Sequence, residues 1–304
     1  MSETRAKPFL KWAGGKSQLL LQFNDYFPSE LKEGTIDFYF EPFLGGGAVF
    51  FYIAQKYNFK QAFLYDINKE LILAYKVVQK DVDKLIELLY RYDKKYKILN
   101  EDERKLFYYD IRNDYNLKEH KINYKKYSSS WIERGAQIIF LNRTCYNGLF
   151  RVNRQGGFNV PFGRYKNPKI VDEENLKKVS CLLKKARIET ADFSKIKRKI
   201  SENSFVYFDP PYKPISNTAN FTSYSKCVFD DTQQIRLAEL YKELDRKKAK
   251  LMLSNSDPKN EDKEDDFFDR LYEDYHIYRV DARRAINSNP EKRGLIKELI
   301  IVNY

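Results

Sequence analysis

The chain has 304 residues, 42% of them hydrophobic, which is enough for one large domain or two moderate ones with a buried core. Lysine and arginine number 55 against 43 for aspartate and glutamate, and the net charge of +12 favours a polyanionic partner over a charge that serves only solubility. Two histidines and three widely spaced cysteines argue against a multi-histidine or zinc centre and against a disulfide framework, so we expect no metal.

The N-terminal segment carries no apolar leader, and no long apolar run follows, so we expect a cytoplasmic protein without a membrane span. Residues 11–17 read KWAGGKS and contain the Gly-Lys-Ser of a phosphate-binding P-loop. That motif requires glycine at position 10, where this chain has Leu10, and no apolar strand precedes it. We therefore reject a nucleoside triphosphatase and interpret Lys16 as a point charge for a carboxylate.

Residues 36–40 and 61–65 have the apolar character of short strands, and residues 48–56 between them have that of a helix. This order predicts a βαβ unit and hence a parallel sheet. Glycines such as Gly45 and Gly47 after the first strand let the backbone approach a ligand closely, and Asp66 at the end of the second strand suits the two hydroxyls of a ribose.

Residues 71–142 have apolar positions at helical spacing and predict a helical insertion with a polar loop at 113–130. Residues 148–161 form two extended runs around Gln-Gly-Gly, which indicates a β-hairpin. Six basic residues and no acidic ones occur from Arg143 to Lys169, interleaved with aromatic residues. A solvated hairpin is possible, but this composition favours a nucleic-acid groove.

An α/β rhythm resumes after about residue 170, with strands expected at 187–190, 205–208, 250–253 and 299–302. The simplest architecture is one α/β domain interrupted by a helical domain. Asp192 follows the first of these strands, where it is placed either in a surface turn or to accept a hydrogen bond from a ligand's adenine amine.

The tetrad Asp209-Pro210-Pro211-Tyr212 directly follows the apolar strand at 205–208 and matches the [DNS]-P-P-[YFW] signature of amino-methyltransferases. An exocyclic aromatic amine is a poor nucleophile because its lone pair is delocalised into the ring. A carboxylate and a backbone carbonyl that accept both amine hydrogens would localise that lone pair. The prolines keep the chain extended and add no competing N–H, and Tyr212 would stack on the base.

Long blocks of the sequence resemble the Dam family of N6-adenine DNA methyltransferases, whose best-known members methylate GATC. The similarity covers nearly the whole chain in the family's motif order. The matching blocks are PFLKWAGGKSQLL, FEPFLGGGAVFF, YDIN, NGLFRVNRQGGFNVPFGRYKNPK, ADF, VYFDPPY, FTSYS and LSNS.

The resemblance implies an α/β, Rossmann-like methyltransferase fold that binds S-adenosyl-L-methionine, with an inserted helical target-recognition domain that carries the β-hairpin. The implied domains are a discontinuous catalytic domain (1–72 and 171–304) and a DNA-binding domain (73–170). Catalysis is assigned to Asp209, Pro210, Pro211 and Tyr212. Cofactor binding is assigned to Trp12, Lys16, Phe43, Gly45, Gly47, Asp66, Asp192 and Asp209, with Lys16 on the methionine carboxylate.

For double-stranded DNA, the family pattern puts Tyr146 and Asn147 at a disrupted base step and Arg151 at a base edge. The other DNA-binding residues expected are Leu149, Asn153, Arg154, Pro161 and Lys166. The target adenine must leave the duplex, because pairing and stacking shield its N6. Its pocket at Asp209 would be covered by the loop at 216–225.

Alternatives remain open at this stage. A methyltransferase-derived binding module would hold DNA without activity, although the intact Asp-Pro-Pro-Tyr tetrad and Asp66 favour an enzyme. The same tetrad serves cytosine N4, RNA bases and a glutamine side-chain amide, and the basic hairpin favours duplex DNA among them. We expect a monomer in a bacterial or archaeal cell, and a partner restriction endonuclease is left open.

Overall fold

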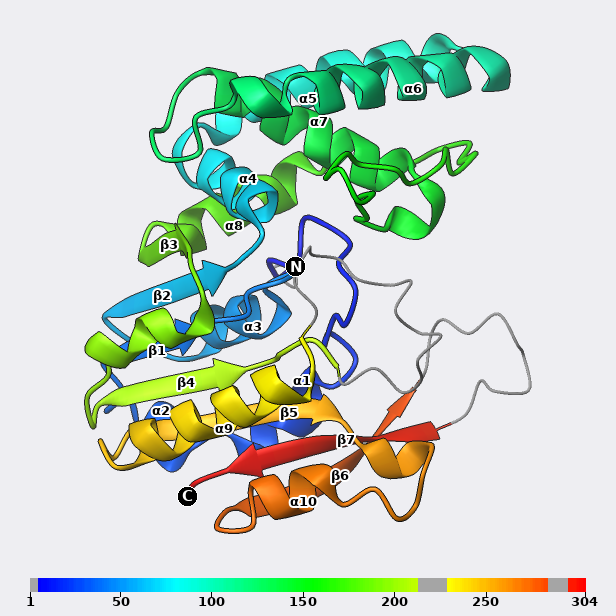
Figure 1. Ribbon diagram of the computed structural model, residues 1–304. Helices are drawn as coiled ribbons and strands as arrows, with labels where there is room; N and C mark the ends of the chain where they lie inside the picture. The colour runs from blue at the N-terminus through cyan, green and yellow to red at the C-terminus, as the bar shows by residue number, and fades with distance from the viewer. Residues whose placement is uncertain (1–4, 213–228, 284–294) are drawn as a thin grey trace.

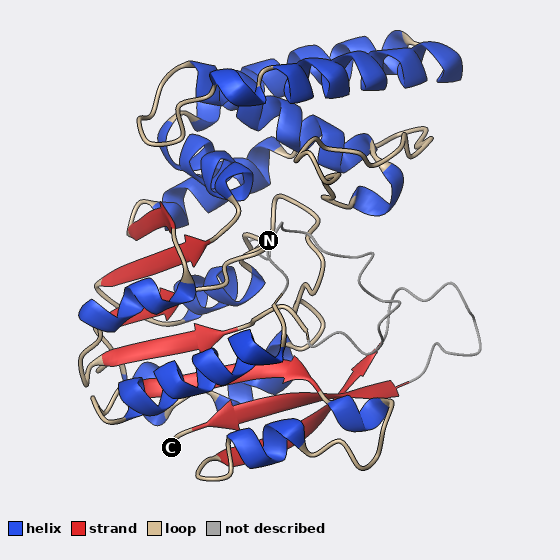
Figure 2. Cartoon of the chain, viewed as in Figure 1, coloured by secondary structure: helices blue, strands red, loops and turns tan. Residues whose placement is uncertain are grey.

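The computed structural model describes residues 5–212, 229–283 and 295–304 (Figures 1 and 2). Its centre is a seven-stranded mixed sheet in the order β3-β2-β1-β4-β5-β7-β6. The first five strands in this order are parallel, and β7 is antiparallel to both of its neighbours. The strands are β1 (Phe38–Glu41), β2 (Gln61–Asp66), β3 (Ala186–Thr190), β4 (Ser204–Phe208), β5 (Lys250–Ser256), β6 (His276–Arg283) and β7 (Leu295–Val302).

Helices cover both faces of the sheet and form a second layer beyond its β3 edge (Figure 1). Those nearest the sheet are α1 (Leu20–Phe23), α2 (Ser29–Glu33), α3 (Ala48–Lys56), α9 (Asp231–Asp245) and α10 (Phe267–Leu271). The others are α4 (Lys69–Lys80), α5 (Val82–Ile98), α6 (Glu101–Leu117), α7 (Ser130–Thr144) and α8 (Glu173–Leu183). None of the helices in the described residues is long and apolar enough to cross a membrane.

Alternation along the strands produces two hydrophobic cores, one on each face of the sheet. In β4, Phe205 and Tyr207 pack into one core, while Val206 and Phe208 pack into the other. Every residue of β4 is buried, as expected for a central strand covered by helices on both faces. The first core continues without a break into the helices beyond β3, so the sheet and the helical layer share one hydrophobic cluster.

The predicted strands, and the helix predicted at 48–56, are confirmed with small shifts of their ends. The strand β6 was not expected, because charged side chains alternate through it and hide its apolar face. The first domain boundary, predicted at residue 72, lies inside the continuous helix α4.

The prediction of a polar loop over 113–130 is wrong in its first part, because α6 continues to Leu117. Its N-terminus is fixed by a capping box between Asn100 and Glu103, and Tyr115 near its other end is buried. The burial of Tyr115 and the ion pair between Asp114 and Lys118 stabilise the last turns of α6, although most residues there are polar.

The β-hairpin predicted at 148–161 does not form two strands. One isolated antiparallel bridge joins Val152 to Phe158, and the turn between them is held by the side chain of Asn153, which accepts from the N–H groups of Gln155 and Gly157. Two backbone hydrogen bonds flank the bridge, from Asn153 to Gly157 and from Asn159 to Arg151, so the two runs meet only over this short stretch.

A buried ion pair joins α4 to α7 in the helical layer. The guanidinium of Arg134, only 2% exposed, donates to both carboxylate oxygens of Glu70 at 2.6–3.1 Å and to the carbonyl of Tyr115 at 2.7 Å. Its carbon lies 3.9 Å from the centroid of the Tyr115 ring, and the Tyr124 hydroxyl donates to Glu70. Removing one partner from such a pair leaves the other charge buried and uncompensated.

We therefore expect Arg134→Met to lower the free energy of unfolding by about 3–5 kcal/mol, measured by urea denaturation. Adding Glu70→Leu should restore part of this loss, because the orphaned carboxylate is then removed. The control is Arg270→Ala, whose exposed pair with Asp266 should be worth less than about 1 kcal/mol. Parent stability in Arg134→Met would show that the pair does not hold the two helices together.

Candidate active site

The candidate site lies where the carboxyl ends of the central parallel strands meet. The chain passes from β1 to β2 on one side of β1, and β4 lies on its other side. The strand order therefore changes direction between β1 and β4, and in open α/β sheets ligands bind in the crevice at that point. Glu41 ends β1, Asp66 ends β2 and Asp209 follows β4, so all three acidic side chains lie along this edge.

A buried lysine lies beside Asp209. The Lys16 ammonium, 3% exposed, is 3.0 Å from Oδ1 of Asp209 and 3.4 Å from Oε2 of Glu298. It also donates to the Tyr212 hydroxyl, which in turn donates to Oε1 of Glu298. Tyr212 and Asp209 are thus the near partners of the ammonium, while Oε2 of Glu298 is close to it but accepts no hydrogen bond among the described residues. The predicted contact of Lys16 with a cofactor carboxylate stays a prediction.

The electrostatics of this cluster follow from its burial. Burial raises the pKa of Asp209 to about 6, because the nearby Lys16 offsets the loss of water only in part and the charge of Glu298 adds to it. Asp209 nevertheless keeps 21% of its side chain exposed, so a ligand can reach it. The Ser254 hydroxyl donates to the same oxygen as Lys16, and no hydrogen bond to Oδ2 is found among the described residues.

Glu41, which lies at the same edge as Asp209, has a different environment. Glu41 is buried and accepts a hydrogen bond from Tyr39 at 2.6 Å. Burial holds the pKa of Glu41 well above its usual range despite that hydrogen bond, and the charge of Asp209 raises it further. Asp209 is therefore the carboxylate of this pair that stays charged near neutral pH.

The prolines after Asp209 hold the chain between β4 and α9. The carbonyl of Pro211 accepts from the buried amide of Gln234 at 3.2 Å. Among the described residues, no hydrogen bond to the carbonyl of Pro210 is found, so that acceptor remains available. The loop expected over the pocket at 216–225 lies outside the described residues.

Gly45 and Gly47 shape the turn after β1. Both have positive φ, 48° and 69°, and a Cβ on Gly47 would lie 2.6 Å from the Tyr75 hydroxyl. The N–H of Gly45 donates to Oδ2 of Asp66 at 3.0 Å, and that of Asn68 donates to Oδ1 at 2.8 Å. Asp66 therefore ties the glycine turn to the end of β2, and burial raises the pKa of its carboxyl despite these bonds.

Phe43 and Asp192 lie at the β2–β3 side of the same edge. The Phe43 ring stacks on Phe193 with centroids 5.3 Å apart and meets Phe229 edge-on at 5.5 Å. The Asp192 carboxylate accepts from Ser194 and from both terminal nitrogens of Arg236. Burial alone would raise the pKa of Asp192, but these hydrogen bonds outweigh it and lower the pKa.

Trp12 links the N-terminal segment to the region expected to contact DNA. Its indole stacks on Phe150 with centroids 5.3 Å apart, and it lies against Gly45, where a Cβ would come within 3.1 Å of the ring. The buried amide of Asn142 accepts from the N–H of Lys11 at 2.8 Å and donates to its carbonyl at 2.9 Å and to that of Gly148 at 2.8 Å. The N-terminal segment is thus bound to the end of α7.

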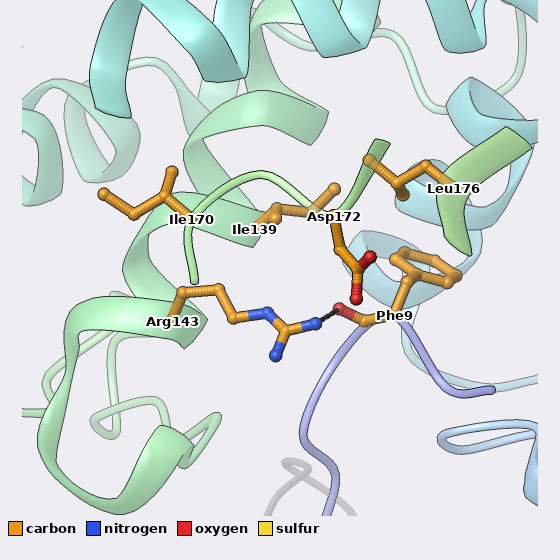
Figure 3. A pocket seen from close by; sticks show the side chains of 6 residues that line it. All are labelled: Phe9, Ile139, Arg143, Ile170, Asp172 and Leu176. Atoms are coloured by element: carbon orange, nitrogen blue, oxygen red, sulfur yellow. Dashed lines mark hydrogen bonds between the residues drawn. The ribbon is translucent and has the colours of Figure 1, made fainter. Parts of the chain in front are cut away.

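A second bond between these elements comes from Arg143, which donates to the carbonyl of Phe9 at 2.9 Å (Figure 3). The small pocket around it is lined by Phe9, Ile139, Arg143, Ile170, Asp172 and Leu176. Arg143 belongs to the basic run noted in the sequence, but here it fixes the chain instead of facing outward. Lys169 of the same run pairs with Asp172 at 2.8 Å.

The residues expected at the disrupted base step lie side by side on the surface. Tyr146 is 55% exposed, and its N–H donates to the carbonyl of Pro161 at 2.8 Å. Asn147 is exposed and has left-handed backbone angles (φ 55°, ψ 10°). A residue other than glycine in this region is uncommon, and asparagine is among those that tolerate it best.

The other predicted DNA-contacting residues lie on the same irregular segment. Arg151 is exposed, and its Nε donates to Oδ1 of Asn159 at 2.8 Å, which orients the guanidinium. Arg154 and Lys166 are exposed, and Leu149 is half-buried. The side-chain oxygen of Asn153 accepts hydrogen bonds from Gln155 and Gly157 within the turn.

Sequence reasoning missed four polar residues that complete the site: Ser254, Glu298, Asn142 and Arg236. Each acts on a residue far away in the chain, so no local pattern marks it. Glu298 alone carries a local signal, as the one acid in β7, directly before its apolar second half. Among the described residues, no cluster of His, Cys, Asp and Glu side chains could hold a metal ion.

Several known proteins are similar in sequence to this chain over nearly its whole length. A 54% identical relative is the type II methyltransferase M.MjaIII of Methanocaldococcus jannaschii, over 98% of this chain and 99% of that protein. The type II methyltransferase M1.LlaDCHI of Lactococcus lactis subsp. cremoris is 38% identical, covering 98% and 95%, and the DNA adenine methylase of Haemophilus influenzae is 35% identical, covering 97% and 93%. A solved structure of precorrin 8W decarboxylase has a TM-score of only 0.38 at 8% identity, covers 98% of each chain and carries no argument.

The model of the D12 class N6 adenine-specific DNA methyltransferases matches residues 12–286, which include Trp12, Asp66 and the Asp209–Tyr212 tetrad. Taken with these relatives, the match shows that the chain belongs to this family and that it is an adenine-specific DNA methyltransferase.

Proposed function

We propose that this enzyme transfers a methyl group from S-adenosyl-L-methionine to N6 of an adenine flipped out of duplex DNA, within the sequence GATC. The observation that supports it best is the position of Asp209, a charged and reachable carboxylate at the switch point of the sheet. S-adenosylmethionine supplies an electrophilic methyl group on a sulfonium when bound.

The residues at the β1–β2 edge suit that cofactor. The turn at Gly45 and Gly47 brings backbone close to the crevice, where a Cβ would collide with Trp12 or Tyr75. Asp66 has further lone pairs for ribose hydroxyls. Phe43 offers an aromatic face for an adenine ring, and we propose that Asp192, although paired with Arg236, accepts a bond from the adenine amine.

The residues after β4 suit the target amine. The free Oδ2 of Asp209 and the unused carbonyl of Pro210 are the two acceptors that we assign to the N6 hydrogens. Accepting both would localise the amine lone pair for attack, and Tyr212 would stack on the base. Lys16 lies against Asp209 and Tyr212, and we propose that it joins this pocket to the methionine carboxylate of the cofactor.

We expect Asp209→Ala to lose about two to three orders of magnitude in the single-turnover methylation rate, as electrostatic contributors of this kind do. DNA binding should persist, which serves as the internal control. In the parent, the rate should fall as the pH drops through about 6, because protonation removes an acceptor.

Asp209→Asn separates charge from shape, because it keeps the size of the side chain and one acceptor oxygen. The remaining methylation rate of this variant should not fall as the pH drops through about 6. A variant that methylates at the parent rate, with the parent pH profile, would exclude Asp209 from the chemistry.

A second prediction concerns the cofactor. Asp66→Ala should weaken S-adenosylmethionine binding by about 2–3 kcal/mol, because charged hydrogen bonds to the ribose and the tether to Gly45 are both lost. Titration calorimetry of parent and variant measures this directly. The matched control is Asp37→Ala, which removes an acid bound to Lys60 at the opposite end of the same strands and should bind normally. Equal affinities for Asp66→Ala and the parent would mean that the cofactor lies elsewhere.

We propose that residues 73–170 form the target-recognition domain, and residues 1–72 with 171–304 the catalytic domain. The exposed residues of the 146–166 segment would then face the duplex, with Tyr146 and Asn147 at the opened step and Arg154 and Lys166 on phosphates. Since two relatives are named type II methyltransferases, we further propose a role in restriction–modification beside a cognate endonuclease.

Recognition of GATC is proposed to depend on Arg151. A guanidinium bridges O6 and N7 of guanine in the major groove, which is worth about 1–3 kcal/mol of discrimination. Its support on Asn159 fixes the plane of the guanidinium before DNA binds.

Arg151→Ala should therefore erode the preference for GATC over sites changed at one guanine, measured as methylation rates on matched duplexes. Lys166→Ala is the control: it should weaken all sequences alike and reduce the slope of affinity against salt by about one counterion. If Arg151→Ala lowered every rate by the same factor, Arg151 would be a backbone anchor and the assignment would fail.

A further inference from the structure

Glu298 is a buried acid on the strand next to β5, facing the proposed catalytic pocket. We propose that it is a positioning residue for methyl transfer, which holds Tyr212 in place and draws part of the Lys16 charge away from Asp209, so that Asp209 is a stronger acceptor for the target amine. This inference rests on the proposed role of Asp209.

The geometry joins four side chains from three distant parts of the chain. Oε1 of Glu298 accepts from the Tyr212 hydroxyl, and Oε2 lies 3.4 Å from the Lys16 ammonium. That ammonium lies 4.4 Å from the centroid of the Tyr212 ring and 3.0 Å from Asp209. The phenol is therefore held at its hydroxyl by both Glu298 and Lys16, which fixes the ring expected to stack on the base.

The position of Glu298 is costly for stability alone. It is only 4% exposed, it lies between Ser256 and Val280 on the neighbouring strands, and Ile300 and Val302 on the same face of β7 are buried in the core. A buried ion pair is often no more stable than hydrophobic residues of similar size. An acid here is better explained by what it does to its partners than by the stability of the sheet.

Its effect follows from the sharing of one positive charge. The groups around Asp209 are Lys16 from the N-terminal segment, Glu298 from β7, Tyr212, Tyr207 of β4 and Glu41 of β1, whose pKa is raised by burial. With Glu298 charged, Lys16 is divided between two carboxylates. Without that charge, Lys16 would pair with Asp209 alone and withdraw electron density from the acceptor that the amine needs.

The test is Glu298→Gln in the full-length enzyme, assayed by single-turnover methylation of a GATC duplex across pH. We expect the plateau rate to fall roughly ten- to a hundred-fold, as small misplacements of reacting groups do. The affinities for S-adenosylmethionine and DNA should stay within about twofold, since no assigned binding group is removed. The acid limb should move to lower pH, because the charge that raises the pKa of Asp209 is gone.

The control is Asp281→Asn on β6, which removes an acid paired with Lys297 at 2.7 Å on the surface of the same sheet. It should keep the parent rate and profile. A Glu298→Gln variant with lower melting temperature but the parent rate and acid limb would reduce Glu298 to a structural residue and overturn the proposal.

Tyr212→Phe provides a second route if Glu298→Gln fails to fold, because it deletes the hydroxyl between Glu298 and Lys16 and keeps the ring. It should be slower than the parent with unchanged cofactor affinity, and a parent rate would overturn the proposal. Where both variants fold, the double variant should be no slower than the slower single one, and multiplied effects would contradict a shared role.

Asp209→Asn in the same assay separates this inference from the proposed function. If Asp209→Asn is inactive while Glu298→Gln behaves like the parent, only the role of Glu298 fails. If Asp209→Asn is as fast as the parent, the proposed chemistry fails first.

Discussion

Burial of the Lys16 ammonium is the constraint on which this end of the molecule depends. Moving a charged amine out of water costs several kcal/mol unless acceptors replace the lost hydration. Here Asp209 and Tyr212 after β4 supply acceptors, and Glu298 on β7 supplies a second negative charge. One lysine therefore holds the N-terminal segment, the end of a central strand and an antiparallel strand at fixed mutual positions, and the crevice exists because all three are held.

The same N-terminal segment also binds the region proposed to face DNA. Asn142 makes a two-bond clamp on the backbone of Lys11, and Trp12 stacks on Phe150. Gly148 completes this contact, because a Cβ there would lie 2.3 Å from the Lys11 side chain. Residues 11–16 thus lie between the exposed Tyr146–Asn147 step on one side and Asp209 on the other.

The parts of the site that sequence could predict are those that follow from strand periodicity. Carboxyl ends of parallel strands share one edge, so acids that directly follow apolar strands, Asp66 and Asp209, can be brought together without a structure. Glu298 and Asn142 could not be found in this way, because their partners are fixed only by the packing of remote elements. The predicted hairpin is present only as an antiparallel bridge from Val152 to Phe158 around a turn, and its two runs do not extend into strands.

The two kinds of backbone at the site suit two different tasks. The groups assigned to chemistry follow or lie on strands that are buried on both faces, where a small displacement is resisted by the whole sheet. The groups assigned to recognition lie on irregular chain whose shape is set by side-chain amides, Asn153 in its turn and Asn159 against Arg151. Such local bonds can be exchanged for others without disturbing the sheet. If the proposed assignment holds, replacing exposed residues of the 146–166 segment should alter which sequence is bound, while Asp209 and its partners keep their geometry.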